Sequence, residues 1–440
     1  MGRATGKAVI LRIADCGLRI VRAKGIPQPS IRNLKTDGSI YIHVLASSLL
    51  VAIIGLGALY ANRVQVRLCR LTKDSAEART CATSAIELGL LHVRLDSNWR
   101  TAWPNGTWMQ DKPLGAGTFT LQGTDPQDND LADSPCDALV LTGIGAKGVA
   151  CHKTQVVLVP AIKPAESLQS CLHGSGLLQV KAGKQITAVG APVSTNGQLD
   201  NEGTIDGNAQ AQSIDHTGTI TGSLATPGPI KHMPDADVIS KYAAKATVIA
   251  SRATIEKVVL APGYNSYGTA DPNGLYVINT GNANLTIRDC RIYGTLVVQV
   301  GTGTVTVDNA VCWQTYRSDF PALLVSGNAV IACTSATTLL SEVTLATNFN
   351  PTGAPYNGGT DNDKKDTYPN EIRGLVHVEG SLKLQQTARI IGAVICNGPA
   401  YVEGTNTITY NTSLYACPPK WYTYVDGMKL SPESWKQVVN

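Results

Sequence analysis

The sequence has little charge and few aromatic residues. Only 16% of its 440 residues are charged and 5% are aromatic, with three phenylalanines, whereas an average globular domain has about 25% charged residues. A disordered chain combines high charge with few apolar residues, but 43% of the residues here are hydrophobic. Global disorder is therefore excluded. The 42 glycines and the many Thr, Val and Ile residues favour a β-rich protein.

Most of the chain also lacks an excess of basic charge. Residues 1–38 carry eight Lys or Arg and two Asp, which gives this segment a net charge of +6. The remaining residues carry 29 basic and 31 acidic side chains, a net charge of −2. Because nucleic-acid binding by charge needs a basic surface, we expect no nucleic-acid partner.

Motifs of known catalytic chemistry are missing as well. The sequence has no GxSxG, HExxH or Walker motif, and no GxGxxG in a nucleotide-binding context. None of the eleven cysteines forms a CxxC pair, which argues against zinc ribbons and thioredoxin-like sites. Cys16 lies in the basic tail. The other ten permit five disulfides, or they are small buried side chains of a β-rich core.

One long uncharged run stands out. Residues 38–62 carry no formal charge with His43 neutral, and residues 44–61 are nearly all apolar. A helix of this length spans about 37 Å, enough to cross a hydrocarbon core of about 30 Å. A buried core helix and a cleaved secretory signal are the alternatives, although the apolar part of a signal is only about 7–15 residues long. We predict a single membrane-spanning helix.

The helical pattern continues beyond the apolar run. No proline occurs in residues 30–103, and small or apolar residues recur at three- and four-residue steps over residues 78–93, as on one helix face. We predict one helix from about residue 40 to 97, with its first half in lipid and its second half packed on a soluble domain. Two helices broken near Arg70 are the alternative. The Lys and Arg residues are balanced close to the span, and only the longer basic tail favours a cytoplasmic N-terminus.

Three tryptophans, Trp99, Trp103 and Trp108, follow this helix. Strand-like stretches separated by Asp, Asn, Pro and Gly clusters come after them. We therefore expect a small antiparallel β domain packed against the helix. The tryptophans are expected in its core or at an interface, and a sugar-binding platform is the alternative.

Internal repeats appear after about residue 177. Residues 274–278 align with 294–298 at an offset of 20, 374–378 with 392–396 at an offset of 18, and 203–207 with 218–222 at an offset of 15. A repeat of this length with short apolar strands is typical of one coil of a parallel β-helix, whose coils stack and share a core. An antiparallel sandwich is the alternative, but it does not keep several markers in register at one offset.

The predicted fold is therefore mainly β, with a long N-terminal transmembrane helix, a small α+β domain and then a parallel β-helix. The expected parts are a basic cytoplasmic tail or leader (1–37), the transmembrane helix and its extension (38–98), the antiparallel β domain (99–165), the β-helix (170–417) and a C-terminal tail or cap (418–440). Residues 234–245 are expected to form a short helix, and residues 348–369 a polar loop.

Two loops concentrate carboxylates. Asp125, Asp128, Asp130 and Asp133 lie within nine residues, and residues 361–366 contain three Asp. Carboxylate oxygens are ligands that Ca²⁺ prefers, although neither loop has the spacing of an EF-hand. Asp- and Asn-rich turns also occur without metal. Asp125, Asp128, Asp130 and Asp133 are the candidate Ca²⁺ ligands, and the loop at 361–366 is a weaker candidate. We expect no other cofactor.

Parallel β-helices often carry polysaccharide lyases and hydrolases, which use several carboxylates along one face. The densest group of charges in the repeats comprises Arg288, Asp289, Arg291 and Asp308, with Arg317 and Asp319 further on. With a 20-residue coil, Asp289 stacks on Asn309, so only one acid occupies that rung position. We therefore interpret the group as solvent-facing ion pairs and assign no catalytic residues.

The region from Lys35 through the apolar helix to residues 85–89 resembles the N-terminal region of type IV pilin-like proteins, and is most similar to minor pilins of the PilX kind and to large pseudopilins. Those carry a basic leader cut after a glycine, and a long helix half in the membrane. Gly38 matches the leader glycine, and His43 stands where major pilins carry glutamate. Residues 374–380 and 392–396 resemble the bactofilin-like β-helix pattern.

The resemblance implies a bacterial protein, anchored by a single pass in the inner (cytoplasmic) membrane, with its large C-terminal domain periplasmic or extracellular. We expect a non-enzymatic structural or surface protein, or a pilus or secretion accessory component. Its expected partners are the lipid bilayer, other pilin-like or envelope proteins, or glycans. A surface polysaccharide lyase or hydrolase is one alternative. A carbohydrate-binding adhesin is another, and it would use exposed aromatic residues such as Tyr264, Tyr267 or Trp313.

Overall fold

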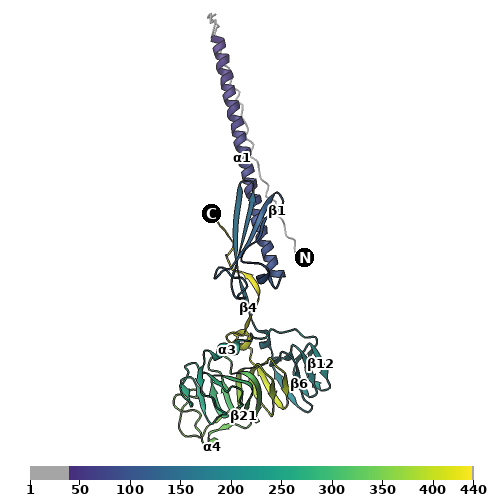
Figure 1. Ribbon diagram of the computed structural model, residues 1–440, viewed down its shortest axis with the longest axis vertical. Helices are drawn as coiled ribbons and strands as arrows, with labels where there is room; N and C mark the ends of the chain where they lie inside the picture. Colours follow the sequence, from purple (N-terminus) through teal and green to yellow (C-terminus); the bar gives the residue numbers. More distant parts are fainter. Residues whose placement is uncertain (1–38, 336, 439–440) are drawn as a thin grey trace, which may run out of the picture. The chain divides into compact units, whose positions relative to one another are not determined.

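The computed structural model describes residues 39–335 and 337–438. Contacts within it divide the described chain into two units, with the boundary between Asp74 and Ser75. The predicted long helix is confirmed, because α1 runs without a break over Ser39–Leu95 (Figure 1). Two helices broken near Arg70 are therefore excluded. Strong helix formers such as Ala, Leu and Arg, and the lack of proline, account for its continuity.

A small antiparallel sheet follows, as predicted, after the short helix α2 (Trp99–Ala102). Its strands in spatial order are β1 (Gly106–Leu114), β2 (Gly117–Thr124), β3 (Leu139–Lys147), β4 (Ala150–Pro164) and β30 (Thr423–Leu430), and β31 (Lys436–Gln437) also pairs with β4. Gly115 and Gly148 have φ angles of 59° and 58°. Glycine adopts this left-handed conformation without steric cost, which allows the tight turns after β1 and β3.

The C-terminal strands were not predicted. The sequence suggested only a tail or cap for residues 418–440, but β30 pairs antiparallel with β4, from Thr423 opposite Pro164 to Leu430 opposite Leu158. Since β4 precedes the β-helix and β30 follows it, the whole β-helix is an insertion between two neighbouring strands of one sheet.

One side of α1 packs on this sheet from Ala78 onward. Ala78 and Ala82 are completely buried, and Gly143 and Gly145 of β3 face them. A Cβ atom at either glycine would lie less than 3.0 Å from backbone atoms of α1. The helix backbone thus lies directly on the sheet backbone, which requires residues without large side chains on both elements.

The tryptophans belong to the core of this domain, as expected. Trp99 and Trp108 are buried with Phe119 and Leu121, and Trp103 packs against the same cluster. The ring of Trp103 lies 5.6 Å from that of Trp108, measured between centroids. The packing of all three tryptophans in this cluster explains these residues without a sugar platform.

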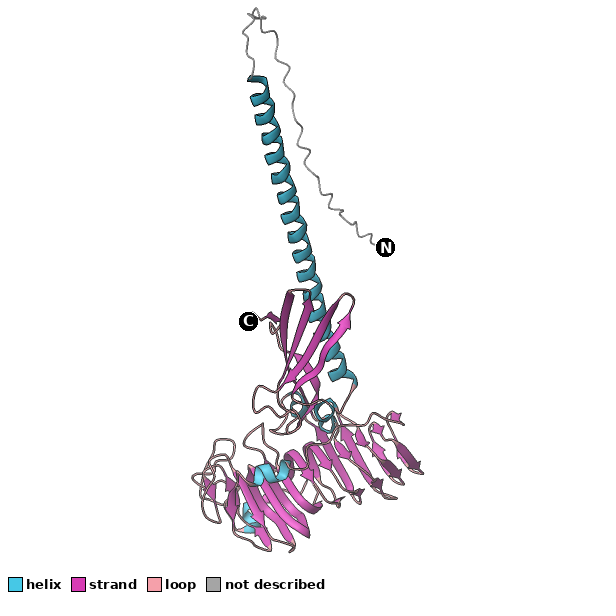
Figure 2. Ribbon diagram, turned by 45° about the horizontal axis from the view of Figure 1, so that its top comes forward, coloured by secondary structure: helices cyan, strands magenta, loops and turns pink. Residues whose placement is uncertain are grey.

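The larger sheet is the parallel β-helix, which the repeats predicted. Figure 2 shows its strands, in magenta, stacked side by side. The strands are β5 (Leu172–Gly174), β6 (Leu178–Val180), β7 (Gln185–Val189), β8 (Val193–Thr195), β9 (Gln198–Asn201), β10 (Thr204–Asp206), β11 (Ala209–Gln210), β12 (Ser213–His216), β13 (Thr219–Ile220), β14 (Leu224–Ala225), β15 (Thr247–Ile249), β16 (Thr254–Glu256), β17 (Val259–Ala261), β18 (Tyr264–Asn265), β19 (Leu275–Asn279), β20 (Leu285–Tyr293), β21 (Thr295–Gln314), β22 (Leu323–Cys333), β25 (Glu371–Val378), β26 (Leu382–Leu384), β27 (Arg389–Cys396), β28 (Ala400–Val402) and β29 (Thr405–Tyr410).

Short elements flank the coils. They are η1 (Glu166–Gln169), α3 (Val238–Ala243), α4 (Glu342–Leu345), α5 (Ser413–Ala416), and the two-stranded sheet of β23 (Leu340–Ser341) and β24 (Thr367–Tyr368). The helix α3 lies within the short helix that the sequence predicted. The polar loop falls between α4 and β25, and it contains β24.

The chain enters and leaves the β-helix at neighbouring coils. The first coil, β5 to β7, pairs on one side with β8, β9 and β10, and on the other side with the last coil, β27 to β29. One end of the β-helix is formed by β12 to β14 and the other by β15 to β17. This order brings the two connections to the antiparallel sheet close together.

The register predicted from the repeats is confirmed. Val277 pairs with Val297, and Thr286 pairs with Thr306, each at the offset of 20. The shorter offsets also hold, since residues 374–378 pair with 392–396, and 204–205 with 219–220. Stacked coils of unequal length therefore share one continuous parallel ladder.

Both faces of several strands are buried. Tyr276 and Ile278 point into the interior of the β-helix with Leu285 and Ile287. Val277 points outward, as alternation requires, and it is covered by a second cluster that includes Val238 and other residues of α3. The helix α3 thus covers a column of apolar side chains that point outward from the β-helix.

All ten cysteines in the described part of the chain are free thiols, and Cys16 lies outside it. Six are buried: Cys81, Cys171, Cys290, Cys312, Cys333 and Cys396. Burial raises the pKa of the Cys171 thiol to about 11 and that of Cys312 to about 12. A thiol that stays protonated is a poor nucleophile. We therefore interpret these six cysteines as small side chains of the core and not as reactive groups.

The burial of His377 predicts a loss of stability in mild acid. Its Nδ1 lies 2.9 Å from the Tyr422 hydroxyl and its Nε2 lies 3.2 Å from Oδ1 of Asn397. Burial lowers its pKa to about 4, whereas an unfolded chain has a histidine pKa of about 6.5. Between these values only the unfolded state binds the proton. The free energy of unfolding therefore decreases as the pH is lowered from about 6.5 to about 4, by up to about 1.4 kcal/mol per pH unit.

This effect can be measured by urea unfolding at pH 7 and at pH 5. His377→Gln is expected to reduce the loss of stability between the two pH values. His216→Gln is the matched control, because His216 is exposed on β12. An unchanged loss in His377→Gln would show that other groups cause the acid sensitivity.

Candidate functional site

The N-terminal half of α1 exposes its apolar side chains. Ile42, Leu50, Ile54 and Leu56 are between 60% and 69% exposed. Among the described residues, α1 is the helix that is long and apolar enough to cross a membrane. An exposed apolar surface of this extent is typical of a site that contacts either another protein or a membrane. Gly38, the predicted leader cleavage site, lies outside the described residues.

The first acidic loop brings three carboxylates together. One oxygen each of Asp125, Asp133 and Asp137 lies within 4.8 Å of the others. Asp137 was not named from the sequence, because it lies beyond the dense run of acids. Asp125 is only 1% exposed, and its Oδ2 has no hydrogen-bond partner in the described structure. Burial, and then the neighbouring Asp128, raise the pKa of Asp133.

The other two predicted ligands have a different arrangement. Oδ1 of Asp128 accepts the backbone N–H of Asp130, and Oδ1 of Asp130 accepts that of Ala132, both at 2.9 Å. Arg100 donates to the backbone oxygens of Leu131 and Asp137, at 3.2 and 2.6 Å. The loop is thus ordered by turns and by the half-buried guanidinium of Arg100. Ca²⁺ binding there stays a prediction, for which Asp125, Asp133 and Asp137 form the tightest group of carboxylates.

The charged group on the β-helix consists partly of ion pairs, as the sequence indicated. Arg288 lies between Glu256 and Asp308 on neighbouring strands, and its Nη2 contacts Oε2 of Glu256 at 2.8 Å. Arg317 pairs with Asp319 at 2.7 Å. These pairs are partly exposed, which fits the interpretation as surface ion pairs.

The interpretation is wrong for Arg291. This residue is only 1% exposed, and its guanidinium donates to the backbone oxygens of Phe349, Ala354 and Pro355. The polar loop folds over it, so Arg291 binds protein rather than solvent. The burial lowers its pKa. No local pattern in the sequence indicated that this loop would cover that face.

Asp289 lines a pocket of about 200 Å³. Its Oδ2 accepts a hydrogen bond of 3.1 Å from Nδ2 of Asn309, and both residues have positive φ angles, of 48° and 53°. The predicted stacking of these two residues is therefore found, at a bulge in β20. Asp289 is the single carboxylate among the residues lining this pocket, whereas glycoside hydrolysis uses a pair.

Two of the aromatic residues considered for an adhesin are not open surfaces. Trp313 is 1% exposed and lies in the interior of the β-helix. The ring of Tyr267 is covered by the guanidinium of Arg252, at 3.4 Å from the ring centroid. The expected exposed row is therefore not formed by these residues.

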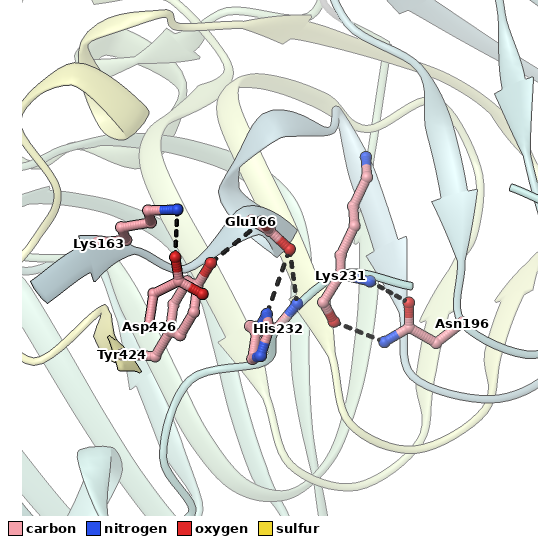
Figure 3. Close-up of polar contacts among 7 residues, drawn as sticks. All are labelled: Lys163, Glu166, Asn196, Lys231, His232, Tyr424 and Asp426. Atoms are coloured by element: carbon pink, nitrogen blue, oxygen red, sulfur yellow. Dashed lines mark hydrogen bonds and ion pairs between the residues drawn. The ribbon is translucent and has the colours of Figure 1, made fainter. Parts of the chain in front are cut away.

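Polar contacts connect the two ends of the insertion (Figure 3). Lys163 of β4 forms an ion pair with Asp426 of β30. The Tyr424 hydroxyl donates to Oε1 of Glu166 at 3.1 Å, and Nδ1 of His232 lies 3.2 Å from Oε2 of the same carboxylate. Partial burial raises the pKa of Glu166, but these hydrogen bonds outweigh it, so the pKa lies below its usual range. Glu166, which follows β4, therefore contacts both Tyr424 of β30 and His232 of the segment between β14 and α3.

A buried lysine lies beside this group. Nζ of Lys231 donates to the hydroxyls of Ser170 and Ser194, at 2.6 and 3.3 Å, and Ser194 contacts Nδ1 of His173 at 2.8 Å. Burial lowers the pKa of Lys231 to about 8 and that of His173 to about 3. Serine and lysine are a nucleophile and base pair in some enzymes. All four side chains are at most 5% exposed, so this group stabilises the coil rather than meeting a substrate.

Comparison with known proteins gives no family. No family model matches the chain, and no curated protein matches it. The solved structures to which the chain is similar include a pilin and two ice-binding proteins, and all three are distant. The competence-associated pilin ComZ from Thermus thermophilus is 11% identical, with 83% of this chain and 98% of that chain covered and a TM-score of 0.28.

The other two are ice-binding proteins. One, from an Antarctic biological consortium, is 16% identical, with 56% of this chain and 91% of that chain covered and a TM-score of 0.28. The other is the DUF3494 domain of ice-binding protein 1 from Shewanella frigidimarina. It is 14% identical, with coverages of 57% and 99% and a TM-score of 0.26. These similarities do not assign a function to this chain.

Proposed function

We propose that this protein is a non-enzymatic, membrane-anchored structural component of a bacterial cell surface, which presents its β-helix outside the cytoplasm. The observation that carries the proposal is the division of α1 into two surfaces. Its N-terminal half exposes apolar side chains such as Ile54, whereas Ala78, Ala82 and Ala85 are completely buried against the sheet. This is the arrangement expected of a pilin-like helix, half in lipid and half packed on its own domain.

The position of the insertion supports a display function. Both connections of the β-helix lie on paired neighbouring strands, β4 and β30, so the antiparallel sheet keeps its pairing around the insertion. Insertions between close chain ends are tolerated because they disturb few contacts of the host domain. The proposed partners are bilayer lipids and, through α1, other pilin-like or envelope proteins.

The topology can be tested on the exposed thiols. Cys136, Cys151 and Cys417 are exposed, so a membrane-impermeant maleimide should label them in intact spheroplasts of an expressing bacterium. Cys16 should be labelled only after lysis. Mass spectrometry identifies the labelled residues. Labelling of Cys16 with protection of Cys417 would reverse the orientation and contradict the proposal.

The anchor can be tested by substitution. Ile53→Lys with Leu56→Lys is expected to release the protein from membranes in alkaline carbonate, because a lysine at the centre of a membrane helix costs roughly 2.5–3.5 kcal/mol. Leu91→Lys is the matched control, since Leu91 is 49% exposed in the later part of the same helix. Equal retention of the double variant and the control would exclude residues 53–56 as the membrane segment.

A further inference from the structure

A second acidic cluster lies on the β-helix, where the polar loop meets α4. One carboxylate oxygen each of Glu342, Asp361 and Asp363 lies within 4.8 Å of the others. Glu342 is fully buried. It accepts hydrogen bonds from the backbone N–H of Asp366 at 3.1 Å and from the Tyr368 hydroxyl at 2.9 Å. The carboxyl group of a buried glutamate is thus fixed beside two loop aspartates.

The cluster has more negative than positive charge. Asp366 joins it as a fourth acid, since its Oδ2 accepts a hydrogen bond from Nδ2 of Asn350 and its backbone N–H donates to Glu342. Lys365 contacts Asp363 at 3.3 Å, and no other ion pair to these four acids occurs within the described ranges. Four carboxylates therefore share one exposed ammonium group. Such an arrangement is stabilised by a bound cation.

Asn350 provides an independent indication of a ligand. This residue is only 5% exposed, and its Nδ2 donates to Oδ2 of Asp361 at 3.2 Å and to Oδ2 of Asp366 at 2.8 Å. Its amide group is therefore directed into the cluster. Its Oδ1 is buried and has no hydrogen-bond partner in the described structure. Turning the amide by about 180° exchanges the positions of Nδ2 and Oδ1. The neutral Oδ1 then points into the cluster, where a cation can bind it.

We propose that this cluster binds Ca²⁺ through the carboxylates of Glu342, Asp361 and Asp363 and the amide oxygen of Asn350. Ca²⁺ takes oxygen ligands at 2.3–2.6 Å, so ligands on opposite sides of the ion lie up to about 5 Å apart, which matches the spacing here. Oδ1 of Asp361 accepts the backbone N–H of Asp363 at 3.2 Å. The two aspartates are thereby held in a compact turn, and water completes the coordination.

The bound ion would hold the polar loop against α4. Glu342 lies on α4, whereas Asn350, Asp361 and Asp363 belong to the loop that covers Arg291. Lys364 and Lys365 are exposed within the same turn. Ca²⁺ should therefore slow tryptic cleavage at these lysines by at least tenfold. The effect does not depend on the proposed membrane function.

The test uses the full chain in detergent, with limited proteolysis followed by mass spectrometry, in EDTA and in millimolar Ca²⁺ with excess Mg²⁺. Wild type should be protected, with a Kd of roughly 10⁻⁴ to 10⁻³ M. Asp361→Asn with Asp363→Asn should lose this protection. Asp125→Asn with Asp133→Asn, in the other acidic loop, is the matched control and should keep it.

Thermal melting in EDTA separates ligand loss from misfolding. Because the double substitution at 361 and 363 removes like charges, it should melt at or above the wild-type temperature without Ca²⁺. It should show none of the Ca²⁺-induced increase. Protection of this variant by Ca²⁺, or no protection of wild type, would overturn the proposal. A lower melting temperature in EDTA would also overturn it, since the aspartates would then stabilise the loop without an ion.

Discussion

Gly145→Ala is expected to destabilise the domain formed by α1 and the antiparallel sheet by about 3 kcal/mol or more. A Cβ atom at this position would lie under 3.0 Å from the carbonyl oxygen of Ala78, the backbone nitrogen of Ala82 and Cβ of Cys81. None of these atoms belongs to the end of a flexible side chain, so the helix as a whole has to move. Overpacking that forces backbone shifts typically costs about 1–3 kcal/mol and sometimes more.

The variant can be compared with wild type by thermal unfolding of the full chain in detergent, followed by tryptophan fluorescence, because Trp99 and Trp108 lie in the affected core. Gly176→Ala is the control, since a Cβ atom there would meet nothing within 4 Å. A Gly145→Ala protein as stable as the control would mean that α1 does not lie directly on β3.

The long helix and the stacked coils of the β-helix were predictable because each follows from a pattern within a short stretch of sequence. The helix α1 combines an uncharged run with a three- and four-residue periodicity, and both are visible within one segment. The coils repeat glycine and apolar strand positions at fixed offsets, so Gly374 could be aligned with Gly392 before their pairing was known. Local periodicity reports secondary structure and stacking well.

The insertion could not be predicted in this way. The strand β30 pairs with β4, whose last residue, Pro164, precedes Thr423 by more than 250 positions. The burial of β30 shows no alternation, since each of its residues is half-buried or exposed. A strand without a buried face carries no period-2 pattern, and its partner is fixed by the closure of the whole β-helix.

In the candidate sites, too, some residues could be identified from the local sequence and others only from the tertiary structure. Asp125 and Asp133 were found because acids are dense along that loop, but Asp137 joins them only through the fold of the loop. Glu342 and Asn350 lie outside the run of aspartates at 361–366. A lone glutamate or asparagine in a polar sequence gives no signal of a ligand. Their role depends on tertiary contacts.

Ile287→Asp is expected to destabilise the β-helix by several kcal/mol. Ile287 is completely buried in the interior cluster, and it pairs with Ile255 on one side and Val307 on the other. An aspartate there would have apolar neighbours above and below, with no hydrogen-bond donor on these side chains. A buried, unpaired carboxylate either pays a large desolvation cost or takes up a proton, and both outcomes destabilise the folded state.

Thr286→Asp provides the matched comparison, because it introduces the same side chain one residue earlier. Thr286 is half-buried on the outer face, in a column of threonines with Thr254 and Thr306. Its carboxylate can reach water, so we expect a change within about 0.5 kcal/mol. Urea unfolding of the two variants measures the difference directly. Equal losses of stability would contradict the alternation of faces along β20, and with it the inward assignment of Leu285 and Ile287.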